Sequence, residues 1–328
     1  MPIVVPDYRA PRWMAGAHMQ TIFSAKVCKT PKVQYRRERW DTPDDDFIDV
    51  DWATPEPADP KTPVLVHFHG LEGSSHSHYA LALMDETIRR GWRGCVAHFR
   101  SCSGEINRQI RTYHGGDIDE MEWILRTVKS RYPEAPLYAV GVSLGGNQLC
   151  LLCGKRPKVA KELLEAGVSI AAPVDLVAGS NLLKQGFNRI YSEVFLNSLI
   201  PKVLKKMDMH PELNKIIDRE AIEKCVNFYD FDSLFTAPVH GFKNAMDYWT
   251  KCSAKPWLKY VEIPLLVLNA KNDPFLPEWA LPTLSDVSDM VWLDQPREGG
   301  HVGFPTGNPP GRVDYLPKRV FRFFLEHR

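Results

Sequence analysis

The chain lacks several features that assign proteins to common classes. Its 328 residues carry 41 Lys and Arg against 40 Asp and Glu, a formal net charge of +1, and they contain no basic block. Without such a block there is no electrostatic basis for strong nucleic-acid binding, so we expect no nucleic-acid partner. The uncharged stretch Tyr138–Gly154 is too short and too broken by glycine to span a bilayer, so we expect no transmembrane segment.

Signals for export and for metal binding are also lacking. The N-terminus shows no charged leader followed by an apolar core, so a secretory signal is not expected. The seven cysteines are an odd number; Cys150 and Cys153 have zinc-like spacing, but no second Cys or His pair accompanies them. We interpret both as core residues of a helix and expect no metal site. Free thiols and no leader together predict a cytoplasmic location.

What the sequence does contain is a regular alternation of apolar strands and helices. A hairpin, expected from Tyr35–Trp40 and Phe47–Trp52, comes first. The next segments alternate between the two types, with strands expected at Val64–Phe68, Gly94–Phe99, Leu137–Val142 and Val168–Ala172 and helices at Tyr79–Arg90, Ile118–Arg131 and Leu144–Cys153. Nearly continuous apolar strands alternating with helices predict an α/β fold with a mostly parallel, doubly wound sheet covered on both faces.

The alternation stops between residues 175 and 259, where the chain becomes helical and charged. Candidate helices there are Leu199–Met207 and Arg219–Cys225. The alternation then resumes with four elements, expected at Leu265–Asn269 (strand), near Glu278–Leu284 (helix), at Met290–Leu293 (strand) and at Tyr315–Glu326 (helix). This organisation predicts a catalytic domain of residues 1–174 and 260–328, with residues 175–259 inserted as a helical cap or lid over the carboxyl edge of the sheet.

The segment Gly141-Val142-Ser143-Leu144-Gly145 fits the Gly-x-Ser-x-Gly nucleophile elbow. Such an elbow is a sharp strand-to-helix turn, and its glycines remove side chains that would clash. The apolar strand Leu137–Val142 leads into the turn and a helix leads out. Alternatives are a turn with no chemistry or a phosphate loop, but the Gly-Lys-Ser/Thr ending of a phosphate loop is absent. We therefore predict Ser143 as a nucleophile.

A serine nucleophile needs a histidine to accept its proton. In proteins with this elbow the order along the chain is Ser, then Asp or Glu, then His, which leaves four candidates. His210 and His240 fall in the insert, and His327 lies near the end of the chain. His301 lies in a glycine-rich loop between a strand and the last helix. The sequence therefore predicts His301 as the base.

The acid is expected just after a late strand, where its carboxylate reaches the far side of the imidazole. Asp273 follows the strand expected at Leu265–Asn269 and precedes Pro274. An Asp before Pro is also an ordinary turn residue. Position and order nevertheless favour Asp273, with Asp175 and Asp294 as second and third candidates.

Acyl transfer also needs two hydrogen-bond donors for the developing oxyanion. The backbone N–H of Leu144, directly after the nucleophile, predicts one donor. The loop after His69-Gly70 predicts the other, where Leu71 is assigned by position alone.

With these residues in view, the chain resembles the α/β-hydrolase superfamily and, within it, the YheT-like hydrolases. The matching segments are spread over nearly the whole chain: His18-Met19-Gln20-Thr21, His69-Gly70-Leu71-Glu72-Gly73-Ser74, His98–Glu105, Tyr113-His114, the elbow, Phe231-Asp232, Thr236-Ala237-Pro238, Gly241-Phe242, Asn272–Phe275 and Gly299–Phe304. The family pattern usually has glycine where Ser101 stands.

The resemblance implies hydrolysis of carboxylic esters with short- to medium-chain acyl groups, through an acyl-enzyme intermediate, with some relatives acting on glycerolipids. It implies that no metal or organic cofactor is needed and that the partner is a small acyl ester. Transfer of the acyl group to an alcohol or thiol stays open, as does a non-catalytic binding protein on the same scaffold. Chain length, alcohol part and oligomeric state are not determined by the sequence.

Several side chains keep two interpretations. Aromatic residues of the insert either line an acyl pocket or pack the cap onto the body: Phe228, Tyr229, Phe231 and Phe235. A second apolar set packs in the core by default, and peripheral lipid contact is its alternative: Phe187, Ile190, Val194 and Leu199. We expect Arg100 to anchor a loop through carboxylates. His114 is interpreted as bonded within a turn, although it could line the entrance to the site.

Overall fold

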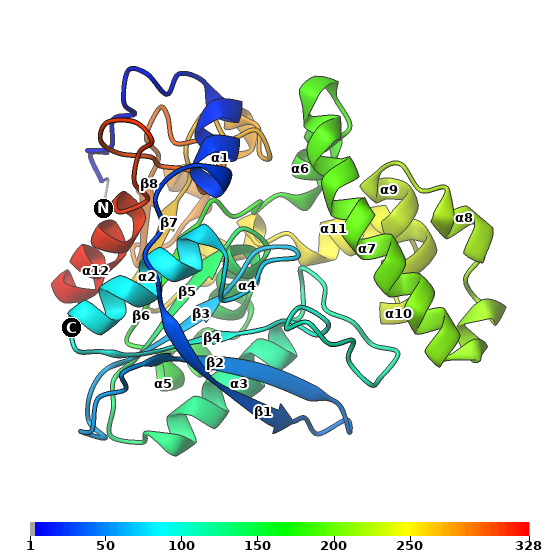
Figure 1. Cartoon of the computed structure of the whole chain (residues 1–328), viewed down its shortest axis with the longest axis horizontal. Helices are drawn as coiled ribbons and strands as arrows, with labels where there is room; N and C mark the ends of the chain where they lie inside the picture. The colour runs from blue at the N-terminus through cyan, green and yellow to red at the C-terminus, as the bar shows by residue number, and fades with distance from the viewer. Residues whose placement is uncertain (1–3, 328) are drawn as a thin grey trace.

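The computed structural model describes residues 4–327 and contains an eight-stranded sheet (Figure 1). The strands lie in the order β1-β2-β4-β3-β5-β6-β7-β8; β1 and β2 run antiparallel to their neighbours and the remaining pairs are parallel. Their bounds are β1 Gln34–Asp41, β2 Phe47–Thr54, β3 Val64–Phe68, β4 Arg93–Ala97, β5 Leu137–Val142, β6 Ala166–Ile170, β7 Leu265–Leu268 and β8 Val291–Asp294. The predicted fold class is confirmed.

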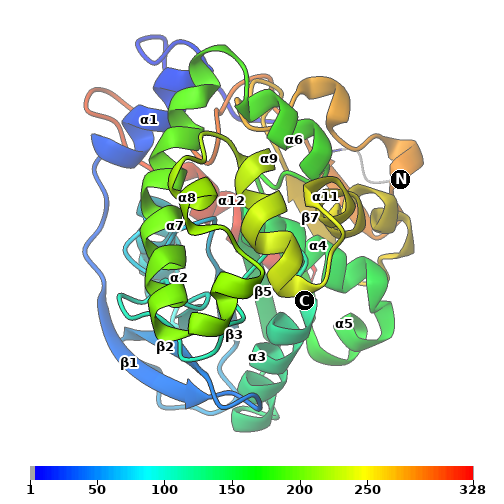
Figure 2. The ribbon, with the colours of Figure 1, turned by 90° about the vertical axis from the view of Figure 1, so that its right-hand side faces the viewer.

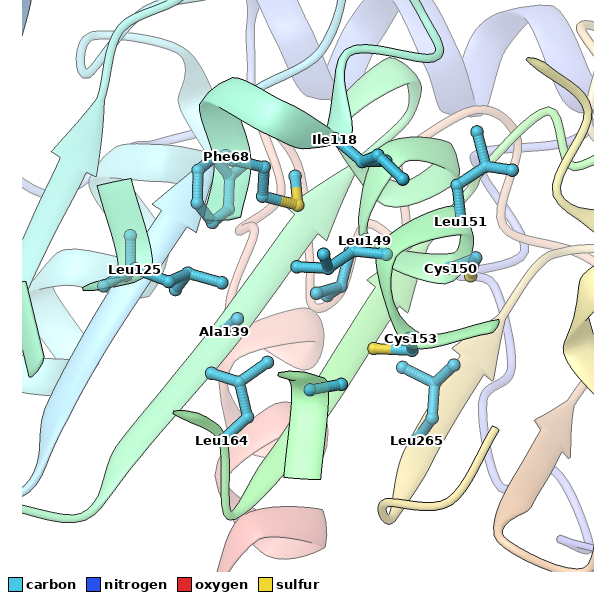
Figure 3. Packing of buried hydrophobic residues seen from close by; sticks show 14 of the residues in the cluster. Phe68, Ile118, Leu125, Ala139, Leu149, Cys150, Leu151, Cys153, Leu164 and Leu265 are labelled. Carbon is cyan, nitrogen blue, oxygen red and sulfur yellow. The ribbon is translucent and has the colours of Figure 1, made fainter. Parts of the chain in front are cut away.

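Helices cover both faces of this sheet. The helices outside the β6–β7 segment are α1 Ala17–Lys26, α2 His78–Arg89, α3 Ile118–Arg131, α4 Leu144–Lys155, α5 Pro157–Leu163 and α12 Tyr315–Glu326. One apolar cluster joins α3, α4 and α5 to the sheet, and a second joins α2 and α12 to it. Figure 3 shows Leu149, Cys150 and Cys153 of α4 packed over the sheet residues Ala139 and Leu265. Both cysteines are fully buried, which confirms them as core residues.

Most expected elements of the body are present. The helices Ile118–Arg131 and Tyr315–Glu326 and the strand Leu137–Val142 have the expected bounds. The expected helix near Glu278–Leu284 is wrong, because the chain there forms only the short 3₁₀ turns η5 Glu278–Ala280 and η6 Leu284–Asp286. Pro282 explains the difference: it lacks an N–H and forces the preceding residue out of the helical region.

The segment between β6 and β7 is built from helices and contains no strand. Its elements are α6 Leu176–Leu183, η1 Gly186–Asn188, α7 Arg189–Met209, η2 Pro211–Lys215, α8 Arg219–Glu223, α9 Phe228–Phe231, the π-helix η3 Asp232–Thr236, α10 Ala237–His240, α11 Ala245–Cys252 and η4 Lys255–Tyr260. We call residues 175–259 the insert and the remaining residues the body. Figures 1 and 2 show the insert gathered on one side of the body, with the long α7 running across it.

The two helices expected in the insert are present. Leu199–Met207 lies inside the longer α7, and Arg219–Cys225 corresponds to α8. The default interpretation of core packing is wrong for three residues of the second apolar set, because Phe187, Ile190 and Val194 are exposed at 49%, 46% and 62%. Among residues 4–327, no helix is both long and apolar enough to cross a membrane.

Candidate active site

Ser143 lies at the sharp turn where β5 meets α4. Its backbone is left-handed, with a φ of 52°, an uncommon conformation for a residue with a side chain. The turn is so tight that a Cβ on Gly141 would stand 2.3 Å from the carbonyl oxygen of Gly145. A Cβ on Gly145 would stand 2.6 Å from the carbonyl oxygen of Phe68. Both glycines are therefore needed for β5 and α4 to hold Ser143 where it lies.

The structure brings Ser143, His301 and Asp273 together. The Nε2 atom of His301 lies 2.9 Å from Ser143 Oγ, and its Nδ1 atom lies 2.9 Å and 3.1 Å from the two carboxylate oxygens of Asp273. Because an ionised carboxylate only accepts hydrogen bonds, Nδ1 carries a proton. In the neutral ring Nε2 is then the acceptor for the serine hydroxyl.

Residues of α1, far away in sequence, hold the loop that carries His301. The hydroxyl of Thr21 accepts the N–H of His301 at 2.9 Å, and the side-chain oxygen of Gln20 accepts the N–H of Gly299 at 2.9 Å. Asn272 donates to the same Gln20 oxygen and accepts the N–H of Gly300. The sequence marked Gln20 and Thr21 through the family resemblance, but no role could be assigned to them without these contacts.

The ring of Phe275 fixes the plane of the imidazole. It stacks on His301 with the ring centroids 3.9 Å apart and the planes 10° from parallel. The N–H of Phe275 also donates to Asp273 at 2.8 Å. Asp273, Phe275 and His301 thus form one packed unit, in which the carboxylate is buried and the imidazole is 9% exposed.

The loop after β3 passes directly beside the nucleophile. A Cβ on Gly70 would stand 3.1 Å from Ser143 Cβ, so the two backbones are in close contact. Within the described chain, the N–H groups of Leu71 and Leu144 donate to no other group, and that of Leu144 is free because it opens α4. The sequence predicted these two amides as the donors for the oxyanion.

The alternative acids and bases lie elsewhere. Asp175 caps α6 by accepting the N–H of Ala178, and Asp294 pairs with the guanidinium of Arg319 at 2.7 Å. The competing histidines bond to other partners: His210 to the carbonyl of Arg108, His240 to Thr112 and His327 to the carbonyl of Phe323. None of these residues has a described hydrogen bond to Ser143, whose hydroxyl bonds to His301.

Comparison with known proteins identifies the family of this chain. A model described as the alpha/beta hydrolase fold matches residues 63–307. The chain is 36% identical to "Putative esterase YheT" of Escherichia coli over 94% of this chain and 90% of that protein. It is 31% identical to "Phospholipase ABHD3" of Mus musculus over 99% of this chain and 79% of that protein. The chain belongs to the α/β hydrolases and is YheT-like.

A solved structure supports the fold of this hydrolase. The esterase Pf2001 of Pyrococcus furiosus superposes with a TM-score of 0.56 over 92% of this chain and 98% of that chain, at 14% identity. At that identity the similarity shows the fold alone. The named relatives place this hydrolase among esterase- and lipase-type enzymes.

A largely apolar cavity of about 1090 Å³, its open mouth included, extends from Ser143 into the insert. Of the four aromatic residues of the insert that the sequence left with two interpretations, three line this cavity: Phe228, Phe231 and Phe235. Phe231 and Phe235 also belong to an apolar cluster inside the insert, so each of them both lines the cavity and packs within the insert. Tyr229 is 39% exposed and is not among the lining residues.

The structure also tests the interpretations of two further residues, Arg100 and His114. Arg100 is buried and pairs with Asp44, Asp46 and Glu120 at 2.6–2.8 Å, which confirms its interpretation as a loop anchor. His114 accepts the N–H of Gly116 within a turn, as expected. His114 also lines the cavity, so the two interpretations of this residue do not exclude each other.

Ser101 stands where the family pattern usually has glycine. Its φ of 66° is the left-handed conformation that glycine adopts without strain. The Ser101 hydroxyl bonds with Asn107 as both donor and acceptor, which helps to hold the residue in that conformation. Among residues 4–327, no group of three His, Cys, Asp or Glu side chains is arranged to hold a metal ion.

Proposed function

We propose that this hydrolase is a serine carboxylesterase that works through an acyl-enzyme intermediate. The observation that carries the proposal is the continuous hydrogen-bonded chain from Ser143 Oγ through the His301 imidazole to the buried Asp273 carboxylate. The chain lies at the carboxyl edge of the sheet, where open α/β sheets bind their ligands. In this proposal Ser143 is the nucleophile, His301 the base and Asp273 the acid that orients it.

The proposed reaction has two steps. In the first, Ser143 Oγ attacks the ester carbonyl carbon while its proton passes to His301 Nε2. The C–O bond to the alcohol then breaks, and His301 returns the proton to the leaving alcohol. In the second, water loses a proton to His301 and attacks the acyl carbonyl carbon. The bond between that carbon and Ser143 Oγ then breaks, His301 returns the proton to Oγ, and the acid is released. The N–H groups of Leu71 and Leu144 stabilise the oxyanion in both steps.

The cavity supports an apolar acyl group as part of the substrate. Its walls expose mostly carbon atoms, contributed on the insert side by Phe195, Leu199 and Phe228. Apolar concave sites suit ligands with a large apolar part. Relatives named as a phospholipase and, in Saccharomyces cerevisiae, a monoacylglycerol lipase agree with such a substrate. We propose short- to medium-chain acyl esters, with residues 175–259 acting as the cap that covers them.

The exposed apolar side chains of Phe187, Ile190 and Val194 favour peripheral contact with lipid as an addition to this proposal. Sedimentation with phosphatidylcholine vesicles tests it. Binding that weakens when all three are replaced by Ser supports the contact, and equal binding of both proteins contradicts it.

The variant Ser143→Ala tests the proposed function. We expect its turnover of p-nitrophenyl butyrate to fall by about 10⁴-fold or more, because the nucleophile is lost. Labelling by a fluorophosphonate probe should disappear as well. Ser130→Ala, on the exposed end of α3, is the matched control and should keep both signals.

Three outcomes separate the alternatives. Full activity in Ser143→Ala would overturn the assignment of the nucleophile, and absence of labelling in the unaltered protein would favour the non-catalytic binding protein. If added alcohol diverts most of the product from free acid to a new ester, the enzyme is an acyltransferase.

A further inference from the structure

Glu72 lies directly after Leu71 in the loop beside the nucleophile, and its backbone is left-handed, with a φ of 54°. Its side chain is 8% exposed. The carboxylate accepts hydrogen bonds from the Tyr113 hydroxyl at 2.8 Å, from Lys202 Nζ at 2.8 Å and from the Ser198 hydroxyl. Since both oxygens already have donors, this carboxylate is occupied by the protein itself and is not a substrate ligand.

The donors come from both parts of the molecule. Ser198 and Lys202 lie one turn apart on the same face of α7 in the insert. Tyr113 belongs to a loop of the body, where its ring stacks on Phe99 with the centroids 5.0 Å apart. Glu72 thus joins α7 to the body at the loop that carries the Leu71 amide.

Tyr113 closes this connection onto the backbone. Its hydroxyl donates to the Glu72 carboxylate and accepts the N–H of Glu72 at 3.0 Å. Burial raises the pKa of Tyr113 well above its usual value, so the hydroxyl keeps the proton that it donates. Side chain and backbone of Glu72 are therefore fixed by the same partner.

The peptide group between Gly70 and Leu71, which carries the Leu71 N–H, is also held at its carbonyl end. The carbonyl oxygen of Gly70 accepts the N–H of Gly73 at 2.9 Å and lies 2.7 Å from Nδ1 of His69. Nε2 of His69 accepts the N–H of Phe99, so Nδ1 carries the proton of this neutral ring. Because a trans peptide is planar, the direction of the Leu71 N–H follows that of the Gly70 carbonyl, so it depends on how the loop is held both before Leu71, at His69, and after it, at Glu72.

We propose that Glu72 is a positioning residue that makes the orientation of the Leu71 N–H depend on the docking of α7. This inference rests on the proposed function. When α7 is docked, Lys202 neutralises Glu72 and the loop is held on both sides of Leu71. When α7 moves away, the loop loses two donors and gains an uncompensated negative charge next to a site where negative charge develops, so acyl transfer slows.

The variant Lys202→Met tests the link by kinetics. With p-nitrophenyl acetate, which is too small to fill the insert side of the cavity, we expect kcat to fall about tenfold with KM nearly unchanged. That loss is smaller than the ~10²- to 10³-fold cost of removing an oxyanion donor. Lys202→Arg should restore most of kcat because it keeps the charge, and Ser198→Ala should lower kcat less than Lys202→Met does.

Lys205→Met is the matched control, since Lys205 is exposed on the same helix; it should leave kcat unchanged. A residue that only shapes the acyl pocket would raise KM for longer esters and leave kcat for the acetate intact. That pattern in Lys202→Met, or an equal loss of kcat in Lys205→Met, would overturn the proposal.

Amide hydrogen exchange tests the link without any activity. In Lys202→Met we expect faster exchange both in α7 and in the peptide covering residues 69–73, and no change in Lys205→Met. Faster exchange in α7 alone would show that the loop is independent of the insert and would refute the link. If the unaltered protein hydrolyses no ester while both segments respond, the proposed function fails and the coupling between α7 and the loop stands.

Discussion

The body and the insert accommodate buried charge in different ways. In the body, buried carboxylates outside the proposed triad face cations: Asp46 and Glu120 pair with Arg100, and Asp294 pairs with Arg319. In the insert, the described partners of the buried Asp232 carboxyl are uncharged: they are the Trp249 indole N–H at 2.7 Å and the Thr236 hydroxyl. The body thus gives these buried carboxylates compensating cations, whereas the insert keeps a buried carboxyl whose described hydrogen-bond donors are uncharged.

The largest effect is expected where compensated charge is broken. Arg100→Met leaves Asp46 and Glu120 buried without their cation and should lower the free energy of unfolding by about 3–5 kcal/mol. Arg126→Met removes an arginine that is 42% exposed and should cost less than about 1 kcal/mol. Urea unfolding of both variants measures the difference. Equal losses of unfolding free energy would mean that the buried ion pairs of Arg100 contribute no more to stability than the exposed ion pairs of Arg126.

The second prediction compares one substitution in the two apolar cores. Leu149→Ala opens a cavity in the large cluster under the sheet, and Leu196→Ala opens one in the small cluster of the insert. Each should cost about 2–5 kcal/mol locally. We expect Leu149→Ala to lower the midpoint of global unfolding, and Leu196→Ala mainly to speed amide exchange in α7, since small clusters open sub-globally. Equal shifts of the global midpoint would show that insert and body unfold as one unit.

The same contrast explains what could be predicted from the sequence. The parallel strands of the body are nearly continuous apolar runs whose carboxyl ends share one sheet edge, so the order of Ser143, Asp273 and His301 was sufficient to anticipate their meeting. The insert offers no comparable repeat: α7 begins ten residues before the helix expected at Leu199–Met207, and it carries Pro201 inside. Only its helical character was predictable.

Contacts between segments far apart in the sequence lay beyond sequence reasoning altogether. Thr21 meets the N–H of His301 across 280 residues, and Glu72 meets Lys202 across 130. Such pairs leave no periodic pattern and depend on how the finished elements pack. The family resemblance marked the segments containing Thr21 and Glu72, but it assigned no partner to either.

The third prediction concerns pH. Burial raises the pKa of Asp232 from 3.8 to about 6, against two hydrogen bonds that lower it. The folded state therefore binds this proton more tightly than the unfolded state, and the resulting stability is complete below about pH 4 and lost as pH rises through about 6. From pH 4 to 7.5, the stability of Asp232→Asn relative to the unaltered protein should rise by about 1–3 kcal/mol. Urea unfolding at the two pH values measures this change, and Asp208→Asn, at an exposed site of α7, should not show it.

The smallest effect is expected on the outer face of α7, where sequence and structure disagree. Had Val194 packed in the core, Val194→Ser would forfeit about 1.5–3 kcal/mol of apolar burial. At 62% exposure we expect the free energy of unfolding to change by less than about 0.5 kcal/mol. Val203→Ser, on the same helix at 3% exposure, is the matched control and should show the full loss. A large loss at Val194 would mean that a partner or another part of the insert covers this face in solution.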